Sequence, residues 1–336
     1  MNVSMSEKIH SKAVVIDSLA FPYILEDQYF ANVKKGGVDA AVITAAISNG
    51  FKDTVLQISK ILKRIAERKD FFCLATSAEE ILEAKIRNKF AVILGFQDIA
   101  PLEGDLTLID TYRSLGVRIM QLTYTGGNMA GDGCGERTDC GLRYFGLEAI
   151  EEMNRLGIVV DLSHTGDATT EEAIRYSKSP VMFTHSNCRA LCDNKRNKTD
   201  EQIKALASKG GYMGLTPHPA LVCKGRSPDL DAFLDHVDHI VKLVGVDHVG
   251  IGLDYVEGLK EEGKTPESVR LWRTRRPDIF GTVDDFFNVS FTKDIDCIEK
   301  LPNFTRGLLT RGYSETDIEK ILGGNFLRVF KDITGQ

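Results

Sequence analysis

The 336-residue sequence lacks several features that would place it in a specialised class of protein. No run reaches 18 apolar residues, and the N-terminal stretch MNVSMSEKIHSKAVVID has no apolar core of the kind that signal peptides carry. There is no basic block, no interleaving of aromatic and basic residues, and the net charge is −6. From these absences we expect a cytoplasmic protein that binds neither a membrane nor nucleic acid.

Cysteine is also scarce, and its spacing is unlike that of zinc motifs. The chain has seven cysteines, and the two close pairs, Cys134/Cys140 and Cys188/Cys192, do not have zinc-knuckle spacing. We therefore expect reduced thiols rather than a disulfide framework. The apolar content of 43% and the charged content of 27% are ordinary for a globular protein.

Short apolar runs alternate with helical patterns along almost the whole chain. The runs are continuously apolar, as expected of strands that are covered on both faces. The eight predicted strands are residues 13–17, 39–45, 90–96, 117–124, 157–163, 180–184, 211–216 and 248–254. Eight strands, each followed by a helix or a long loop, predict an α/β fold with one (β/α)8 TIM barrel over residues 1–336. A doubly wound open sheet is the alternative.

Two helices and two long loops complete this interpretation. Residues 53–70 and 77–86 have helical patterns, and the second begins with Ser77 and Glu80 in the spacing of a capping box. Residues 125–143 and 255–282 are predicted to be loops longer than those that usually join a strand to a helix. In a barrel, such loops surround the face at which chemistry takes place.

Polar side chains follow most of the predicted strands. They are Asp17, Gln97, Tyr124, His164, His185, His218 and Asp254. His164 and His185 end consecutive strands, and neighbouring parallel strands lie about 4.8 Å apart. Neutral imidazoles so placed can share one divalent ion such as Zn²⁺. The sequence therefore predicts that His164 and His185 bind a metal, and we expect His218 to line the barrel mouth.

Several motifs, in this order, resemble those of one known family. DLSH, FTHS, KRN (195–197) and GIGLDY are similar to motifs of the membrane (renal) dipeptidase family, peptidase family M19, among the amidohydrolase-type barrels. The resemblance runs from VVID to EKILGGNFLRVF (319–330), which is similar to the closing helix of that family. It implies a metallo-dependent hydrolase barrel with a binuclear zinc centre. It also implies hydrolysis of dipeptides, including those with a D-residue at the C-terminal position.

The resemblance assigns roles to several residues. His164 and His185 match the two ligands of the second zinc of the family. Asp254 matches the aspartate that contacts the metal-bound water, and Arg196 matches the arginine that receives the terminal carboxylate of the substrate. Tyr124 stands where the family has a histidine near the substrate.

The ligands of the first zinc are replaced. The family has Asp-Gly-His-x-Asp where this chain has DSLAF, so Leu19 and Phe21 occupy the ligand positions, and Gln97 occupies that of the bridging glutamate. Leu and Phe offer no lone pairs, and a neutral amide does not offset the repulsion between two dications. We therefore expect the first of the two metal sites to be absent and only one divalent metal, zinc, to be bound, at the site of His164 and His185.

These observations favour a metal-dependent, dipeptidase-like hydrolase of small amide or peptide substrates. Asp254 is predicted to be the general base, and the predicted substrate-binding residues are Arg196, Tyr124, Gln97 and Tyr255. One alternative is a metal-free barrel that binds a small carboxylate-bearing amino-acid derivative without hydrolysing it. Another is different chemistry at the same mouth, such as an isomerisation. The expected partner is a small-molecule substrate, and a homodimer is left open.

Overall fold

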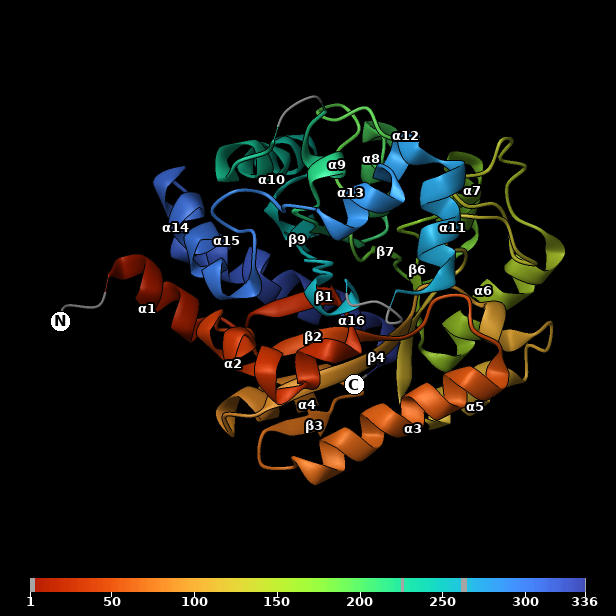
Figure 1. The fold of residues 1–336 in the computed structure, drawn as a ribbon, viewed down its shortest axis with the longest axis horizontal. Coiled ribbons are helices and arrows are strands. Elements are labelled where there is room, and N and C mark those ends of the chain that lie inside the picture. The colour runs from red at the N-terminus through yellow and green to blue at the C-terminus, as the bar shows by residue number, and fades with distance from the viewer. Residues whose placement is uncertain (1–3, 225–226, 261–264, 336) are drawn as a thin grey trace.

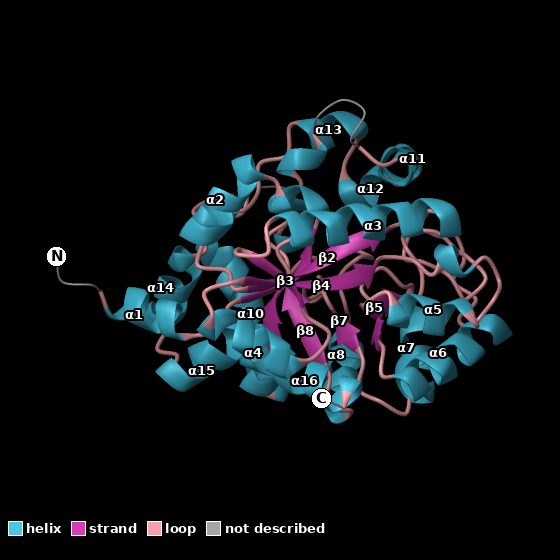
Figure 2. Cartoon of the chain, turned by 90° about the horizontal axis from the view of Figure 1, so that it is seen from below, coloured by secondary structure: helices cyan, strands magenta, loops and turns pink. Residues whose placement is uncertain are grey.

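The computed structural model describes residues 4–224, 227–260 and 265–335 (Figure 1). Its core is a sheet of parallel strands whose hydrogen-bonded order is β1-β2-β4-β5-β6-β7-β8-β9. These strands are β1 (Ile16–Ala20), β2 (Ala40–Ala46), β4 (Phe90–Phe96), β5 (Val117–Gln121), β6 (Val159–Asp161), β7 (Met182–Phe183), β8 (Tyr212–Leu215) and β9 (Val249–Ile251). Figure 2 shows the strands gathered at the centre with helices around them.

The sheet is nearly closed into a barrel by contacts between its first and last strands. The amide of Leu253 donates to Asp17 Oδ1 at 2.7 Å, and the amide of Asp254 donates to the Leu19 carbonyl at 3.1 Å. The (β/α)8 barrel predicted from the sequence is therefore confirmed, and the open sheet is not formed.

All eight predicted strands are present, but the ends of most are shifted, and the structure has one additional strand. β5 and β9, for example, end three residues earlier than predicted. β1 begins three residues later than predicted, because Val15 is held in the preceding connection, where its amide donates to Asp39 Oδ2. Asp17 is consequently inside the strand rather than after it. A short additional strand, β3 (Phe72–Leu74), was not predicted. It pairs with residues 90–92 of β4, whereas β5 pairs with residues 94–96, so β3 lies toward the opposite end of the barrel from the strand-end histidines.

The helices of the described residues surround the strands. They are α1 (Met5–Lys12), α2 (Asp27–Lys35), α3 (Phe51–Glu67), α4 (Ala78–Ile86), α5 (Leu108–Ser114), α6 (Tyr144–Leu156), α7 (Asp167–Tyr176), α8 (Asp200–Ser208), α9 (Pro219–Val222), α10 (Leu230–Val244), α11 (Glu267–Arg275), α12 (Pro277–Phe280), α13 (Val283–Phe287), α14 (Pro302–Thr310), α15 (Glu315–Glu319) and α16 (Asn325–Thr334). Of these described helices, none has both the length and the apolar character needed to span a membrane.

The predicted helices are present with small changes. Residues 53–70 correspond to α3, and residues 77–86 to α4, where Ser77 accepts from the amide of Glu80 at 3.1 Å. The Glu80 carboxylate accepts from the amide of Thr76 instead of returning to Ser77, so only half of the predicted capping box forms. The predicted closing helix at 319–330 spans the end of α15, a π-helical turn at Lys320–Gly324 and most of α16.

The two predicted long loops differ from each other. Residues 125–143 contain no helix or named strand, as expected. Residues 255–282 are not one loop, because α11 and α12 form within them, and residues 261–264 lie outside the described part of the chain. Figures 1 and 2 show α11, α12 and α13 grouped together.

Backbone packing is tight where β7, β8 and β9 approach β1. The Ser18 hydroxyl lies 2.5 Å from the Thr184 carbonyl oxygen and 2.7 Å from that of Ile251. A Cβ atom at Gly214 or at Gly252 would lie 2.2 or 1.9 Å from the same Thr184 oxygen. Glycine is therefore required at both positions, and the strand end that carries His185 is enclosed by backbone.

Candidate metal and substrate site

His164 and His185 meet at the mouth of the barrel, as their positions after β6 and β7 predict. Their Nε2 atoms lie 3.0 Å apart, and both side chains are buried. Burial lowers the pKa of both rings well below the ordinary value, and the nearby Arg196 guanidinium adds to this effect. Both imidazoles are therefore neutral near pH 7, which is the protonation state that a metal ligand needs.

A hydrogen-bond network fixes the orientation of the His185 ring. The Thr184 hydroxyl donates to Asp161 Oδ2 at 2.6 Å, so its lone pair accepts from His185 Nδ1, 2.8 Å away. The hydrogen of His185 is therefore assigned to Nδ1, which leaves the lone pair of Nε2 directed at His164. On the other ring, Nδ1 of His164 lies 3.2 Å from the Thr125 hydroxyl. Such outer partners hold metal-binding histidines in position.

The candidate donor atoms that converge in the described part of the site are two imidazole nitrogens. Two nitrogens bound to one tetrahedral zinc lie roughly 3.3 Å apart, close to the 3.0 Å between the Nε2 atoms of His164 and His185. Within residues 4–224, 227–260 and 265–335, no group of three or more His, Cys, Asp or Glu side chains is placed to hold a metal. Asp254, which the resemblance places beside the metal-bound water, does not join the pair as a ligand. Two imidazoles alone would hold the ion weakly, and its other positions would be left to water, substrate or a neutral oxygen.

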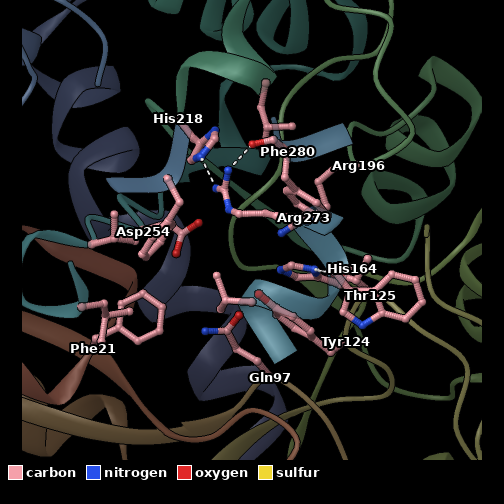
Figure 3. Close-up of a pocket in the computed structure, with 16 residues that line it drawn as sticks. Phe21, Gln97, Tyr124, Thr125, His164, Arg196, His218, Asp254, Arg273 and Phe280 are labelled. Atoms are coloured by element: carbon pink, nitrogen blue, oxygen red, sulfur yellow. Dashed lines mark hydrogen bonds between the residues drawn. The ribbon is translucent and has the colours of Figure 1, made fainter. Parts of the chain in front are cut away.

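The first metal position holds no suitable ligands. Leu19 and Phe21 are buried, and Phe21 lines the cavity together with Gln97. Figure 3 shows the Gln97 amide directed into this space. Its Nε2 donates a hydrogen bond to Thr44 Oγ1 at 3.0 Å. The amide oxygen of Gln97 is therefore the atom that most resembles a carboxylate oxygen at this position.

Asp254 is a buried carboxyl group held in an unusual backbone conformation. It follows β9 with a φ of +53°, in the left-handed region that non-glycine residues rarely adopt. Burial raises the pKa of its carboxyl to about 7, against the lowering effect of Arg196 and Arg273. A carboxyl group with this pKa can both accept and return a proton near neutral pH.

Arg196 is buried and bound mainly to the ends of the two histidine strands. Its Nη1 donates to the Ser163 carbonyl at 2.5 Å and to Ser186 Oγ at 2.6 Å, and its Nη2 donates to the His185 carbonyl at 2.8 Å. Its Nε–H is buried without a partner. Arg196 therefore positions the backbone of His185, and of its five N–H groups only Nε–H and the second N–H of Nη2 are left for a ligand.

Aromatic residues form much of the cavity wall. The Tyr124 ring stacks on His164 with 4.3 Å between ring centroids, and Trp272 and Phe280 also line the cavity (Figure 3). The cavity encloses about 580 Å³, including its opening to solvent. His218 lines it as predicted, with Nε2 3.4 Å from Arg273 Nη2.

Tyr255 does not reach this cavity, although it was predicted to bind substrate. Its ring packs on Phe291 with 4.9 Å between centroids, and its hydroxyl donates to the Ile295 carbonyl. Tyr255 therefore lies on the Phe291 side, whereas Asp254 lines the cavity.

Arg273 is a buried cation in the cavity that the sequence patterns did not predict. It lies on α11, within a segment that was predicted to be a loop. Val269, Trp272 and Arg273 have the i, i+3, i+4 spacing of one helix face, and all three line the cavity. That spacing could have indicated Arg273 as a cavity residue, but only if residues 267–275 had been predicted to form a helix.

Comparisons with known proteins agree with this geometry. The family model described as membrane dipeptidase (peptidase family M19) matches residues 9–271 and 280–335. A crystal structure of an amidohydrolase from Pseudomonas aeruginosa is 32% identical, with a TM-score of 0.89, over 98% of this chain and 99% of that chain.

Curated relatives include dipeptidase verJ of Clonostachys rogersoniana, 29% identical over 83% of this chain, and dipeptidase 3 of Homo sapiens, 28% identical over 77% of it. The matched regions span 65% and 48% of those two relatives. The family match, which covers nearly the whole barrel and both histidines, shows that this chain belongs to the membrane dipeptidase family, peptidase family M19.

Proposed function

We propose that this protein hydrolyses small peptide or amide substrates with one divalent metal ion, zinc, in place of a binuclear centre. The observation that carries the proposal is the convergence of the His164 and His185 Nε2 atoms at 3.0 Å, beside positions where Leu19 and Phe21 offer no ligand. Family membership supports the reaction class, and the altered donor set supports the change in metal number.

The bound ion would supply an activated water and would polarise the substrate carbonyl. Asp254 would accept a proton from the attacking water and return it to the amine nitrogen as the C–N bond breaks. Its raised pKa suits this exchange. Arg196 Nε–H and the Gln97 amide would orient the substrate, with Tyr124 as an apolar wall. The small, enclosed cavity favours a compact molecule that carries a carboxylate.

One observation favours a second candidate function. Because the described residues hold no third His, Cys, Asp or Glu ligand, the same cavity would also serve a barrel that binds a small amino-acid derivative without cleaving it. Retention of the histidine pair with its threonine partners favours the hydrolase. A cytoplasmic location and a homodimer stay predictions.

Turnover in the presence of added metal separates the two candidates. The protein is assayed with Zn²⁺, Mn²⁺ or Co²⁺ against L,L- and L,D-dipeptides and N-acyl amino acids. The hydrolase requires turnover that falls at least tenfold in Asp254→Asn and is unchanged in Asp110→Asn, an exposed aspartate on α5. Absence of turnover with every metal, together with saturable binding of a dipeptide, would establish the binding protein instead.

A further inference from the structure

Arg273 belongs to a part of the chain that the family model does not match. The match ends at residue 271 and resumes at residue 280, and the unmatched residues 272–279 carry both Trp272 and Arg273. Both side chains line the cavity that holds His164 and Asp254. The segment therefore contributes cavity wall at a place that the family model does not cover.

The Arg273 guanidinium is held in place by neutral groups. Its Nη1 donates to the carbonyls of Phe280 and Thr282, and its Nη2 lies 3.4 Å from His218 Nε2. The Cζ atom of the guanidinium lies 5.0 Å from the centre of the Phe286 ring. None of the hydrogen bonds found in the described part of the chain uses its Nε.

This guanidinium is only 7% exposed, and Asp254 and Asp285 act on its charge only from a distance. Among the described residues, no carboxylate lies within 4 Å of the nitrogens of Arg273 or of Arg196. Burial lowers the pKa of both guanidinium groups, because the protein interior solvates their positive charge less well than water does. A buried cation that no carboxylate of the described residues contacts directly is suited to bind one from outside.

Within the described residues, the cavity has two guanidinium groups that no carboxylate contacts directly. Its lining has two guanidinium groups, Arg196 and Arg273, and one carboxyl group, Asp254, because His164 and His218 are neutral. Figure 3 shows both guanidinium groups on the side of the cavity away from Gln97. A substrate with one carboxylate would satisfy at most one of the two cations, whereas a substrate with two carboxylates would satisfy both.

We propose that Arg273 binds a second carboxylate of the substrate, so that the preferred substrates are dipeptides or N-acyl amino acids with an aspartate or glutamate side chain. The inference rests on the proposed function for its reaction and adds the substrate class. The rings of Phe280 and Phe286 lie 6.0 and 5.0 Å from the Cζ atom of Arg273 and would shield the ion pair from water, which strengthens it.

The test compares substrates of nearly equal shape that differ in one charge. Alanyl-aspartate and alanyl-asparagine, each as L,L and L,D isomers, are compared by kcat/KM. We expect the acid-to-amide ratio to exceed ten for the wild type and to approach one for Arg273→Gln. Arg273→Lys, which keeps the charge, should lie between them. Arg270→Gln, on the exposed face of α11, should keep the wild-type ratio.

The acid-to-amide ratio of kcat/KM distinguishes recognition of the substrate charge by Arg273 from a structural role of this residue. A disturbed cavity would lower kcat/KM for both dipeptides and leave their ratio unchanged. If dipeptides are hydrolysed and the wild-type ratio is near one, or if Arg273→Gln lowers both rates equally, the inference fails and the proposed function stands. Calorimetry of the same dipeptides with the Asp254→Asn variant measures their binding in the absence of the proposed general base. Tighter binding of alanyl-aspartate that Arg273→Gln removes, without turnover in the wild type, would support the inference and overturn the proposed function.

Discussion

The Nε2 atoms of His164 and His185 face each other at 3.0 Å, and a threonine hydroxyl lies beside the far nitrogen of each ring. Thr184, which contacts His185, is itself hydrogen-bonded to Asp161. Asp161 therefore fixes the orientation of the His185 Nε2 lone pair through a chain of two hydrogen bonds. Four expected outcomes follow from this pair and its surroundings.

The first concerns metal content. Protein dialysed against Zn²⁺ should retain at most one equivalent per chain, measured by elemental analysis. His185→Ala should lose this metal while the protein stays folded, because one imidazole alone binds zinc poorly. His239→Gln is the control, since His239 pairs with Asp200 away from the cavity. Retention of two tightly bound equivalents would contradict the one-metal site.

The second concerns the threonine that supports His185. Thr184→Val keeps the side-chain shape but removes the acceptor for His185 Nδ1 and one donor to Asp161. Zinc affinity should fall about 10- to 100-fold, as for other outer-partner losses, and stability should fall by about 1–3 kcal/mol. Thr310→Val, on the exposed surface of α14, serves as control. Equal zinc affinity in Thr184→Val and the wild type would show that His185 does not bind the ion.

The third concerns the pH dependence of stability in metal-free protein. Burial raises the pKa of Asp254 from 3.8 to about 7, so between these values the folded chain holds a proton that the unfolded chain has lost. Stability therefore falls as pH rises through this window. Asp254→Asn removes this loss, and asparagine tolerates the left-handed backbone. Its advantage over the wild type in urea unfolding should be small near pH 4 and on the order of 2–4 kcal/mol at pH 8. A constant difference across the window would contradict the raised pKa.

The fourth concerns restoration of the first metal position. Leu19→His, Phe21→Asp and Gln97→Glu together should raise zinc content toward two equivalents per chain. Without metal, the triple variant should be less stable by about 2–7 kcal/mol, because it buries polar groups that lack partners. Metal titration followed by thermal unfolding checks both effects. If the triple variant binds no additional zinc, the segments around these residues have also been rebuilt.

The sequence predicted the barrel and the histidine pair because both depend on local, periodic information. Each strand is a continuous apolar run, and a residue that follows a parallel strand must lie at the mouth, so His164 and His185 were brought together by topology alone. The start of β1 was misplaced by three residues because Val14 and Val15 are as apolar as the strand itself.

The positions of Asp254, Tyr255 and Arg273 depend on information that strand patterns do not contain. Asp254 adopts a left-handed backbone after β9, which sets its direction independently of the strand. Tyr255 consequently faces the Phe291 side. Arg273 enters the cavity only because residues 267–275 form a helix, and the charged composition of that segment, RLWRTRRP, favours a solvated loop when neighbouring elements are unknown.

The glycines that face the Thr184 carbonyl have a consequence for how the protein would take up its metal. Because Gly214 and Gly252 leave no space for even one methyl group there, the backbone before His185 has a single packed position. The histidine does not have to move or become ordered when an ion arrives, so binding incurs little conformational entropy. Metal-free and metal-loaded protein should therefore have the same backbone conformation at this strand end, and the ion would bind to a site whose geometry is already formed.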